Sequence, residues 1–397
     1  MSDDKQRRWR QDTRLVRGGT ERSEFGETSE ALFLTSGYVY ESAEEAEARF
    51  KGEAEGFIYS RYGNPTVRMF EERLALLEGA EECFATSSGM AAVFASLMCQ
   101  LKTGDHVVAS RALFGSCHHI LTQILPRFGI ETTLVDGPDL DQWQAALKPE
   151  TACIFLETPA NPTLDLVDIA AVAEMAHAVD ARVIIDNVFA TPLLQKPFEL
   201  GADVVVYSAT KHIDGQGRTL GGAVLGSEHF IMEVLQPLMR HTGPALSPFN
   251  AWVLLKGLET LSLRLERMCA NALTLAEFMT RRPEIGMVIY PGLDSHPQRE
   301  LACRQMKGAG SLITFELAAG GGAAFKFLNA LELVDISNNL GDAKSLITHP
   351  ATTTHRAMGV EGRAQIGVTD AMVRLSVGLE DPADLMEDLE RALKAVG

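Results

Sequence analysis

The sequence lacks the features that mark membrane proteins, secreted proteins and metalloenzymes. None of its apolar runs approaches the ~20 residues that a membrane-spanning helix needs, and the first ten residues hold no apolar core of the signal-peptide kind. Its six cysteines include no C-x-x-C pair, which predicts reduced thiols. The ten histidines show no metal-ligand spacing. We therefore expect a cytoplasmic protein that neither enters a membrane nor uses a metal ion.

Positive charge is scarce as well. The 397 residues include 36 Lys and Arg against 53 Asp and Glu, which gives a formal net charge of -17. An acidic surface repels nucleic acid and anionic lipid, so the composition argues against both as partners while leaving room for a local basic pocket. The 46% of hydrophobic and 22% of charged residues are ordinary for a soluble globular enzyme.

The chain is long enough for two or three domains. Residues 1–60 are polar and irregular, which predicts an N-terminal arm that supplies no core and packs on another subunit. Residues 61–245 alternate β-branched runs with helical segments, which predicts a large domain with a mostly parallel sheet covered on both faces. Residues 246–397 predict a smaller α+β domain. The fold class is therefore α/β.

Individual elements follow from the same patterns. Apolar residues between 254 and 279 step by four and three, which predicts one long helix that bridges the domains. Asp381 and Pro382 predict the start of a last helix. Strands are expected at 106–109, 132–135, 152–156, 183–186, 203–206, 312–315 and 373–377.

The chemistry is predicted to centre on Lys211, which follows the apolar strand 203–206. A lysine at the end of a buried strand is poorly solvated, which lowers its pKa and provides a neutral, nucleophilic amine. Ser208, Thr210 and the glycine-rich segment 215–222 suit a phosphate. Together they predict a Schiff base with pyridoxal phosphate. The alternative, from this motif alone, is a solvated loop lysine.

Two more segments suit the same cofactor. Asp186 ends an apolar strand, where a carboxylate needs a partner such as a pyridine nitrogen; the alternative is a helix-capping aspartate. Residues 86–92 form a glycine-containing turn that opens a helix, and the free N–H groups of such a turn suit a phosphate. The turn alone is weak evidence, since many helices begin with Ser-Gly.

Six ordered motifs carry a family resemblance. They are SGMA at 88–91, ETPANP at 157–162, DN at 186–187 with FATP at 189–192, SATK at 208–211, YPGL at 290–293 with SHP at 295–297, and RLSVG at 374–378. Over residues 13–397 the chain resembles the cysteine and methionine metabolism family of fold-type-I pyridoxal phosphate enzymes. The resemblance implies a transferase with a large cofactor-binding domain and a smaller C-terminal domain.

The resemblance also implies a role for each matching residue. Lys211 is the Schiff-base residue and proton shuttle, and Asp186 contacts the pyridine nitrogen. Arg374 clamps the substrate α-carboxylate, a task that suits guanidinium geometry. Asn161 lies near the cofactor hydroxyl and the substrate, and Asn339 near the substrate. The other cofactor contacts from the same subunit are Ser88, Gly89, Met90, Ser208 and Thr210.

Tyr59 and Arg61 lie in YSRYGNPT, residues 59–66. This stretch resembles the family segment that enters the neighbouring subunit's site and holds its phosphate. The resemblance therefore implies a homo-oligomer with shared sites, and a tetramer built as a dimer of dimers.

Two departures from the family pattern bear on the reaction. Phe114 stands where the family usually has a tyrosine, and it can stack on the cofactor ring but cannot exchange a proton. An ester substrate tolerates this change, because its carboxylate leaves unaided, whereas a lyase that protonates a thiolate does not. Asn339 stands where many relatives have serine. With HPATTTH at 349–355, it resembles the homoserine-ester sulfhydrylases, and the succinyl-ester branch best.

These features predict γ-replacement of succinate in O-succinylhomoserine by sulfide, which gives homocysteine in methionine biosynthesis. The alternatives are a cystathionine γ-synthase, an O-acetylhomoserine sulfhydrylase and, less favoured because of Phe114, a methionine γ-lyase. A binding or scaffold protein without turnover is a further alternative, which the intact Lys211, Asp186 and Arg374 oppose. Candidates for binding the succinyl carboxylate are Arg49, Lys51 and Arg111.

Overall fold

The computed structural model describes residues 6–396. The predicted arm and the N-terminal stretch without an apolar core both begin in residues 1–5, which lie outside the described part. The described chain divides into two compact units. Unit 1 contains the chain up to Gln100 with residues 206–210 and 218–260, and unit 2 contains residues 101–205, 211–217 and the chain from Leu261 onward. The predicted domain boundaries near residues 60 and 245 stay a prediction.

The larger sheet has seven strands in the order β1-β7-β6-β5-β4-β2-β3. Unit 2 contributes four neighbouring parallel strands, β2 (His106–Ser110), β3 (Glu131–Val135), β4 (Thr151–Glu157) and β5 (Arg182–Asp186). Unit 1 contributes the antiparallel pair β1 (Glu82–Thr86) and β7 (Gly222–Gly226), and β6 (Val204–Tyr207) is divided between the units. The prediction of a mostly parallel sheet is confirmed.

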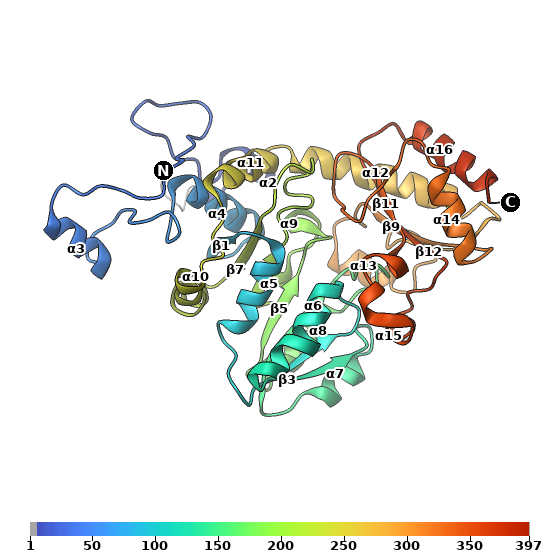
Figure 1. Ribbon diagram of the computed structural model, residues 1–397, viewed down its shortest axis with the longest axis horizontal. Helices are drawn as coiled ribbons and strands as arrows, with labels where there is room; N and C mark the ends of the chain where they lie inside the picture. The colour runs from blue at the N-terminus through green and yellow to red at the C-terminus, as the bar shows by residue number, and fades with distance from the viewer. Residues whose placement is uncertain (1–5, 397) are drawn as a thin grey trace. The chain divides into compact units, whose positions relative to one another are not determined.

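The smaller sheet belongs to unit 2 and has the order β10-β11-β12-β9-β8. Its strands are β8 (Ile285–Ile289), β9 (Leu312–Leu317), β10 (Asp335–Ile336), β11 (Leu346–Thr348) and β12 (Met372–Ser376). Helices α12 (Leu261–Met279), α14 (Gly321–Asn329) and α16 (Pro382–Lys394) lie beside it (Figure 1, yellow to red). One apolar core joins these elements, and it includes Phe315, Phe327 and Leu389. The predicted α+β character of this region is confirmed.

The predicted long helix between 254 and 279 is wrong as a single element. The chain instead forms α11 (Pro248–Leu258) and α12, with a break at Glu259 and Thr260. Gly257 weakens the last turn of α11, because glycine is a poor helix former. The boundary between unit 1 and unit 2 falls at this break.

The remaining α-helices are divided between the two units. In unit 1 they are α2 (Gln11–Arg17), α3 (Ala43–Lys51), α4 (Pro65–Glu78), α5 (Gly89–Met98) and α10 (Gln236–Thr242). In unit 2 they are α6 (Gly115–His119), α7 (Leu140–Ala146), α8 (Ile169–His177), α9 (Thr191–Leu194), α13 (Arg299–Gln305) and α15 (Gly359–Gln365). As predicted, Asp381 caps α16, and its side chain accepts the Ala383 N–H at 2.9 Å. Among residues 6–396, no helix is both long and apolar enough to cross a membrane.

The N-terminal segment of unit 1 is held at one end and exposed at the other. Leu15 of α2 is only 1% exposed, so the prediction that this segment supplies no core is wrong at that residue. Farther along, α3 buries no side chain, and it lies beyond long extended segments (Figure 1, dark blue). Val39 is 94% and Phe25 85% exposed. Among the described residues, these are the two most exposed large apolar side chains.

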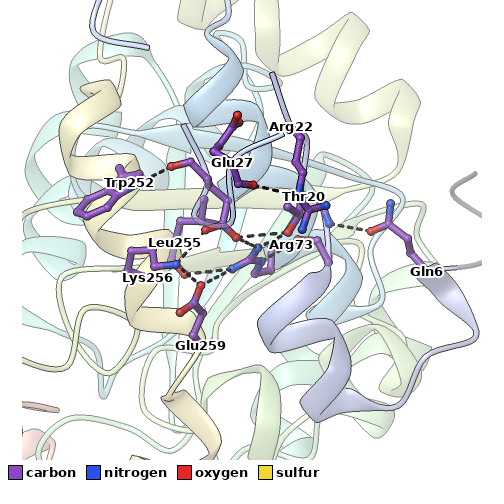
Figure 2. A network of polar contacts seen from close by, with 12 residues as sticks. Gln6, Thr20, Arg22, Glu27, Arg73, Trp252, Leu255, Lys256 and Glu259 are labelled. Atoms are coloured by element: carbon purple, nitrogen blue, oxygen red, sulfur yellow. Dashed lines mark hydrogen bonds and ion pairs between the residues drawn. The ribbon is translucent and has the colours of Figure 1, made fainter. Parts of the chain in front are cut away.

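A buried ion network holds the anchored end (Figure 2). Arg73 of α4, which is fully buried, donates to Glu30 Oε1 at 2.5 Å and to the Gly18 carbonyl at 2.7 Å. Lys256 of α11 donates to Glu30 Oε2 at 2.9 Å and also contacts Glu259. Burial opposes the charge of Glu30, but the bonds from Arg73 and Lys256 outweigh it and lower the pKa of Glu30 to about 2. The carboxylate of residue 30 therefore ties the N-terminal segment to both helices.

Candidate active site

Lys211 lies in unit 2, four residues after β6 ends. Its Nζ donates a hydrogen bond to Oδ1 of Asn339 at 2.6 Å. Burial, and then the positive charge of Arg374, lower the pKa of Lys211 to about 8. An amine with this pKa is neutral far more often near pH 7 than an exposed lysine, as a nucleophile or base requires.

Arg374 lies on β12, a central strand of the smaller sheet, and is 1% exposed. Its Nη1 donates to Asn161 Oδ1 at 2.9 Å, and its Nη2 donates to the carbonyls of Asn338 and Asn339 at 3.0 and 3.3 Å. Burial lowers its pKa to about 10, although Glu157 opposes this shift. Within residues 6–396, its Nε has no hydrogen-bond partner. A buried guanidinium whose Nε–H group has no partner can donate a hydrogen bond to a substrate carboxylate.

Asp186 and Glu157 end the neighbouring parallel strands β5 and β4, where they are register partners. Burial raises the pKa of Asp186 to about 7, although the Val188 N–H, which donates to its Oδ1 at 3.1 Å, opposes this shift. Burial and then the charge of Asp186 raise the pKa of Glu157 well above its ordinary value. Two carboxyls side by side disfavour double ionisation, and a cation beside Asp186 would stabilise its charge.

Glu157 and Asn161 form hydrogen bonds that link several segments of this site. Glu157 accepts the backbone N–H of Asn161 on Oε1 and that of Phe114 on Oε2, both at 2.9 Å. The Asn161 carbonyl lies 3.1 Å from Nε2 of His355, and burial, then Arg374, lower the pKa of His355 to about 4. His355 is therefore neutral and donates through Nε2, because a carbonyl can only accept.

The predicted phosphate-binding residues Ser88, Gly89, Met90, Ser208 and Thr210 all belong to unit 1. Ser88 caps α5 by accepting the Ala91 N–H at 3.2 Å, and Gly89 and Met90 form the first turn, whose N–H groups have no partner within the helix. A Cβ at position 89 would stand 2.5 Å from that of Ser208, so only glycine allows this approach. Thr210 Oγ1 accepts the Gly221 N–H at 3.1 Å. This turn can receive an anion.

Tyr59 and Arg61 are also in unit 1, and Tyr59 is 42% exposed. The guanidinium of Arg61 lies 5.4 Å from the ring centre of Tyr59 and 4.7 Å from that of Tyr62, and it donates to the Arg240 carbonyl. Stacking on two aromatic rings holds the cation at the surface of this unit.

The three candidate cations for a succinyl carboxylate already have partners. Arg49 and Lys51 form ion pairs with Glu45 and Glu47 within α3. Arg111 donates to the Leu134 carbonyl at 3.0 Å.

Sequence reasoning missed two residues at this site, Glu157 and His355. Both lie in motifs that carry the family resemblance, at the start of ETPANP and the end of HPATTTH. The signal for Glu157 was its place at the end of a strand next to that of Asp186. Its contacts with Phe114 and Asn161 depend on how two loops return to the same strand end, which strand periodicity does not reveal. No three of the His, Cys, Asp and Glu residues between 6 and 396 are placed to hold a metal ion.

Comparison with known proteins gives consistent matches along the whole chain. Residues 12–394 match the family model described as Cys/Met metabolism PLP-dependent enzyme. The O-succinylhomoserine sulfhydrylase of Mycobacterium tuberculosis (strain ATCC 25618 / H37Rv) is 61% identical over 382 residues, covering 95% of this chain and 94% of that protein. The O-succinylhomoserine sulfhydrylase of Pseudomonas aeruginosa is 51% identical over 385 residues, with coverage of 97% and 95%.

Solved structures agree with the sequence matches. The putative O-acetylhomoserine (thiol)-lyase of Campylobacter jejuni superposes with a TM-score of 0.94 at 33% identity, covering 97% of this chain and 100% of that one. That crystal structure contains N'-pyridoxyl-lysine-5'-monophosphate. The fold predicted from sequence is therefore confirmed.

Proposed function

Since the chain belongs to the Cys/Met metabolism pyridoxal phosphate-dependent enzyme family, we propose that it replaces the succinyl group of O-succinylhomoserine by sulfide to form homocysteine. Two relatives that carry this activity in their names, at 61% and 51% identity, support the choice. The observation that carries the proposal is the position of Asn339, which accepts from the Lys211 amine on Oδ1 and from Arg374 on its carbonyl. An amino acid whose carboxylate binds Arg374 thus brings its Cα close to the lysine.

The residues present fit the family's cofactor. Asp186 is a buried carboxyl whose pKa is raised to about 7, and a protonated pyridine nitrogen would supply the cation that this carboxylate needs. Gly89 leaves open a turn that a Cβ would fill, and we propose that Ser88, Gly89, Met90, Ser208 and Thr210 bind the phosphate there. When bound, pyridoxal phosphate supplies an electron sink for negative charge on the substrate Cα.

The chain's own residues then bind, orient and move protons. Arg374 holds the α-carboxylate, with Asn161 and Asn339 fixing the guanidinium. The Lys211 amine, whose pKa of about 8 gives a larger neutral fraction than an exposed lysine has, takes the Cα proton in its neutral form and returns a proton to the product. Phe114 provides an apolar face and no proton. Succinate leaves as a stable carboxylate without an acid, whereas a thiolate would need one.

We extend the proposal to the assembly and location of the enzyme. The exposed apolar side chains Phe25, Leu34 and Val39 support an N-terminal segment that binds a second copy of the chain. Tyr59 and Arg61 would then enter the partner's site, and two such dimers would form a tetramer. The substrates are small molecules, which agrees with a cytoplasmic enzyme that uses neither nucleic acid nor a membrane.

A matched assay tests the reaction. Succinyl- and acetyl-homoserine are each supplied with sulfide and with cysteine, and homocysteine and cystathionine are measured. We expect the highest kcat/KM for the succinyl ester with sulfide. A higher value with cysteine would identify a cystathionine γ-synthase, and a higher value for the acetyl ester would identify the acetyl-ester sulfhydrylase. Release of a thiol from methionine at a comparable rate would contradict the role given to Phe114.

A further inference from the structure

Glu157 binds two different loops of this site, and none of the roles described above accounts for both contacts. It is 4% exposed at the end of β4, and its two carboxyl oxygens accept two backbone N–H groups from different loops. One N–H belongs to Phe114, at the start of α6, and the other to Asn161. A buried carboxyl that spans two loops sets the distance between them.

We propose that Glu157 is a positioning residue, which fixes Phe114 and Asn161 around the cofactor and stays protonated so that Asp186 carries the only negative charge of the pair. The positioning follows from the two hydrogen bonds at 2.9 Å. Because Asn161 also accepts from Arg374, a shift of Glu157 moves the substrate clamp as well. This inference rests on the proposed contact between Asp186 and the cofactor, but it does not depend on which ester is the substrate.

The protonation follows from the groups that face Glu157. Asp186 on β5 is its register partner, so its side chain leaves the sheet on the same face. Cys117 of α6 lies near both carboxyls, and burial, then the charge of Asp186, raise the pKa of its thiol well above the ordinary value, so it stays neutral. The charge of Arg374 on β12 opposes the raised pKa of Glu157, but the hydrogen bonds of Arg374 go to Asn161, Asn338 and Asn339. A protonated carboxyl still accepts on both oxygens, so it can keep both N–H groups.

The test compares three substitutions in the holoenzyme, with cofactor affinity and the pH midpoint of the bound cofactor's visible absorbance as readouts. Glu157→Gln is neutral like the protonated acid, so we expect the midpoint to move by less than about 0.3 units. Glu157→Ala removes both acceptors and should weaken cofactor affinity at least about tenfold. If the alanine variant does not fold, Glu157→Asp replaces it, since this side chain is one methylene too short to reach both loops.

Asp388→Asn is the matched control. Asp388 is also a buried carboxyl, and it accepts the N–H groups of Glu332, Leu333 and Val334 on another part of unit 2. Its substitution should lower thermal stability and leave both cofactor readouts unchanged. Asp186→Asn, measured in parallel, should alter the absorbance, and a normal spectrum there would contradict the proposed ring contact instead.

Two results would overturn the inference. If Glu157→Gln lowers the midpoint by about a unit or more, a negative charge has been removed and Glu157 is ionised. If the shortened variants bind the cofactor within about twofold of the wild type, the hydrogen bonds to Phe114 and Asn161 do not position the site.

Discussion

Phe114 shows how one side chain can restrict the chemistry of a site. Its backbone N–H is bound to Glu157, so the ring is held at the start of α6 although nothing polar extends from it. A phenyl ring stacks as well as a phenol, but it exchanges no proton. In the proposed function, Phe114 therefore contributes to cofactor binding but not to the protonation of a leaving group.

We predict that Phe114→Tyr keeps the γ-replacement of the ester, with kcat/KM within about tenfold, because the ester needs no acid. The new hydroxyl should allow slow release of thiols from thioether amino acids, measured as thiol formation. Phe114→Ala serves as the control and should weaken cofactor binding by removing the stacking surface. Loss of ester activity in the tyrosine variant at full cofactor occupancy would show that the ring does more than stack.

At the scale of elements, the ion network of Glu30, Arg73 and Lys256 connects the N-terminal segment to helices α4 and α11 of the same unit. We predict that Glu30→Gln destabilises the protein by up to about 3–5 kcal/mol at pH 7, because it leaves the fully buried Arg73 with only the more distant carboxylate of Glu259, 3.8 Å away. Urea unfolding of both proteins measures the difference.

The destabilisation caused by Glu30→Gln should become smaller as the pH falls. The pKa of Glu30 is lowered from 4.5 to about 2 on folding, so its contribution is complete above pH 4.5 and falls away as the pH approaches 2. The gap between wild type and Glu30→Gln should therefore narrow between pH 5 and pH 3. Glu45→Gln, which breaks an ion pair within α3, should shift the unfolding midpoint little at either pH. An equal gap for Glu30→Gln at both pH values would contradict the network.

Strands that are buried on both faces were the easiest elements to predict from the sequence. The strands β2, β4 and β5 are largely buried apolar runs, whereas β3 is a partly exposed edge strand, and the predicted ends of all four lie within one residue of the observed ones. The pair β1 and β7 was not predicted, because β7 begins and ends with glycine and lacks the side chains that mark a strand. The break between α11 and α12 was missed, because the apolar periodicity continues through it.

Apolar periodicity also reveals little about the contacts within the site. The predicted residues Lys211, Asn161, Asn339 and Arg374 are joined by hydrogen bonds; Lys211 was found from its place at the end of an apolar strand as well as from a motif, and the other three from motifs alone. The contacts of Glu157 were beyond reach, because they depend on where the chain returns after leaving the strand. Roles for these residues stay predictions until variants are measured.

At the scale of the whole molecule, the proposed assembly predicts complementation between two inactive variants. Lys211→Ala and Arg61→Ala each damage the site, but in a shared-site dimer the two side chains of one site come from different chains. When equal amounts are unfolded and refolded together, about half of the dimers are mixed, and each mixed dimer has one intact site. Activity should therefore recover to roughly a quarter of the wild-type value.

Mixing the folded variants without unfolding is the control and should restore much less activity. Mass measurement shows whether mixed dimers have formed. Mixed dimers without activity would mean that Lys211 and Arg61 act in the same chain, where the bond from Arg61 to the Arg240 carbonyl would be its working position rather than a resting one.

The ion network can form only late in the synthesis of the chain. Glu30 and Lys256 are 226 residues apart, so a ribosome needs on the order of 10–45 s to make the second after the first, at roughly 5–20 residues per second. Unit 1 takes its last segment from residues 218–260, so its first hundred residues wait for most of the parallel strands to emerge. During that interval Glu30 and Arg73 have been made but Lys256 has not, so the network is incomplete in the nascent chain. A chaperone that binds the unfinished N-terminal part of unit 1 would act mainly in this period.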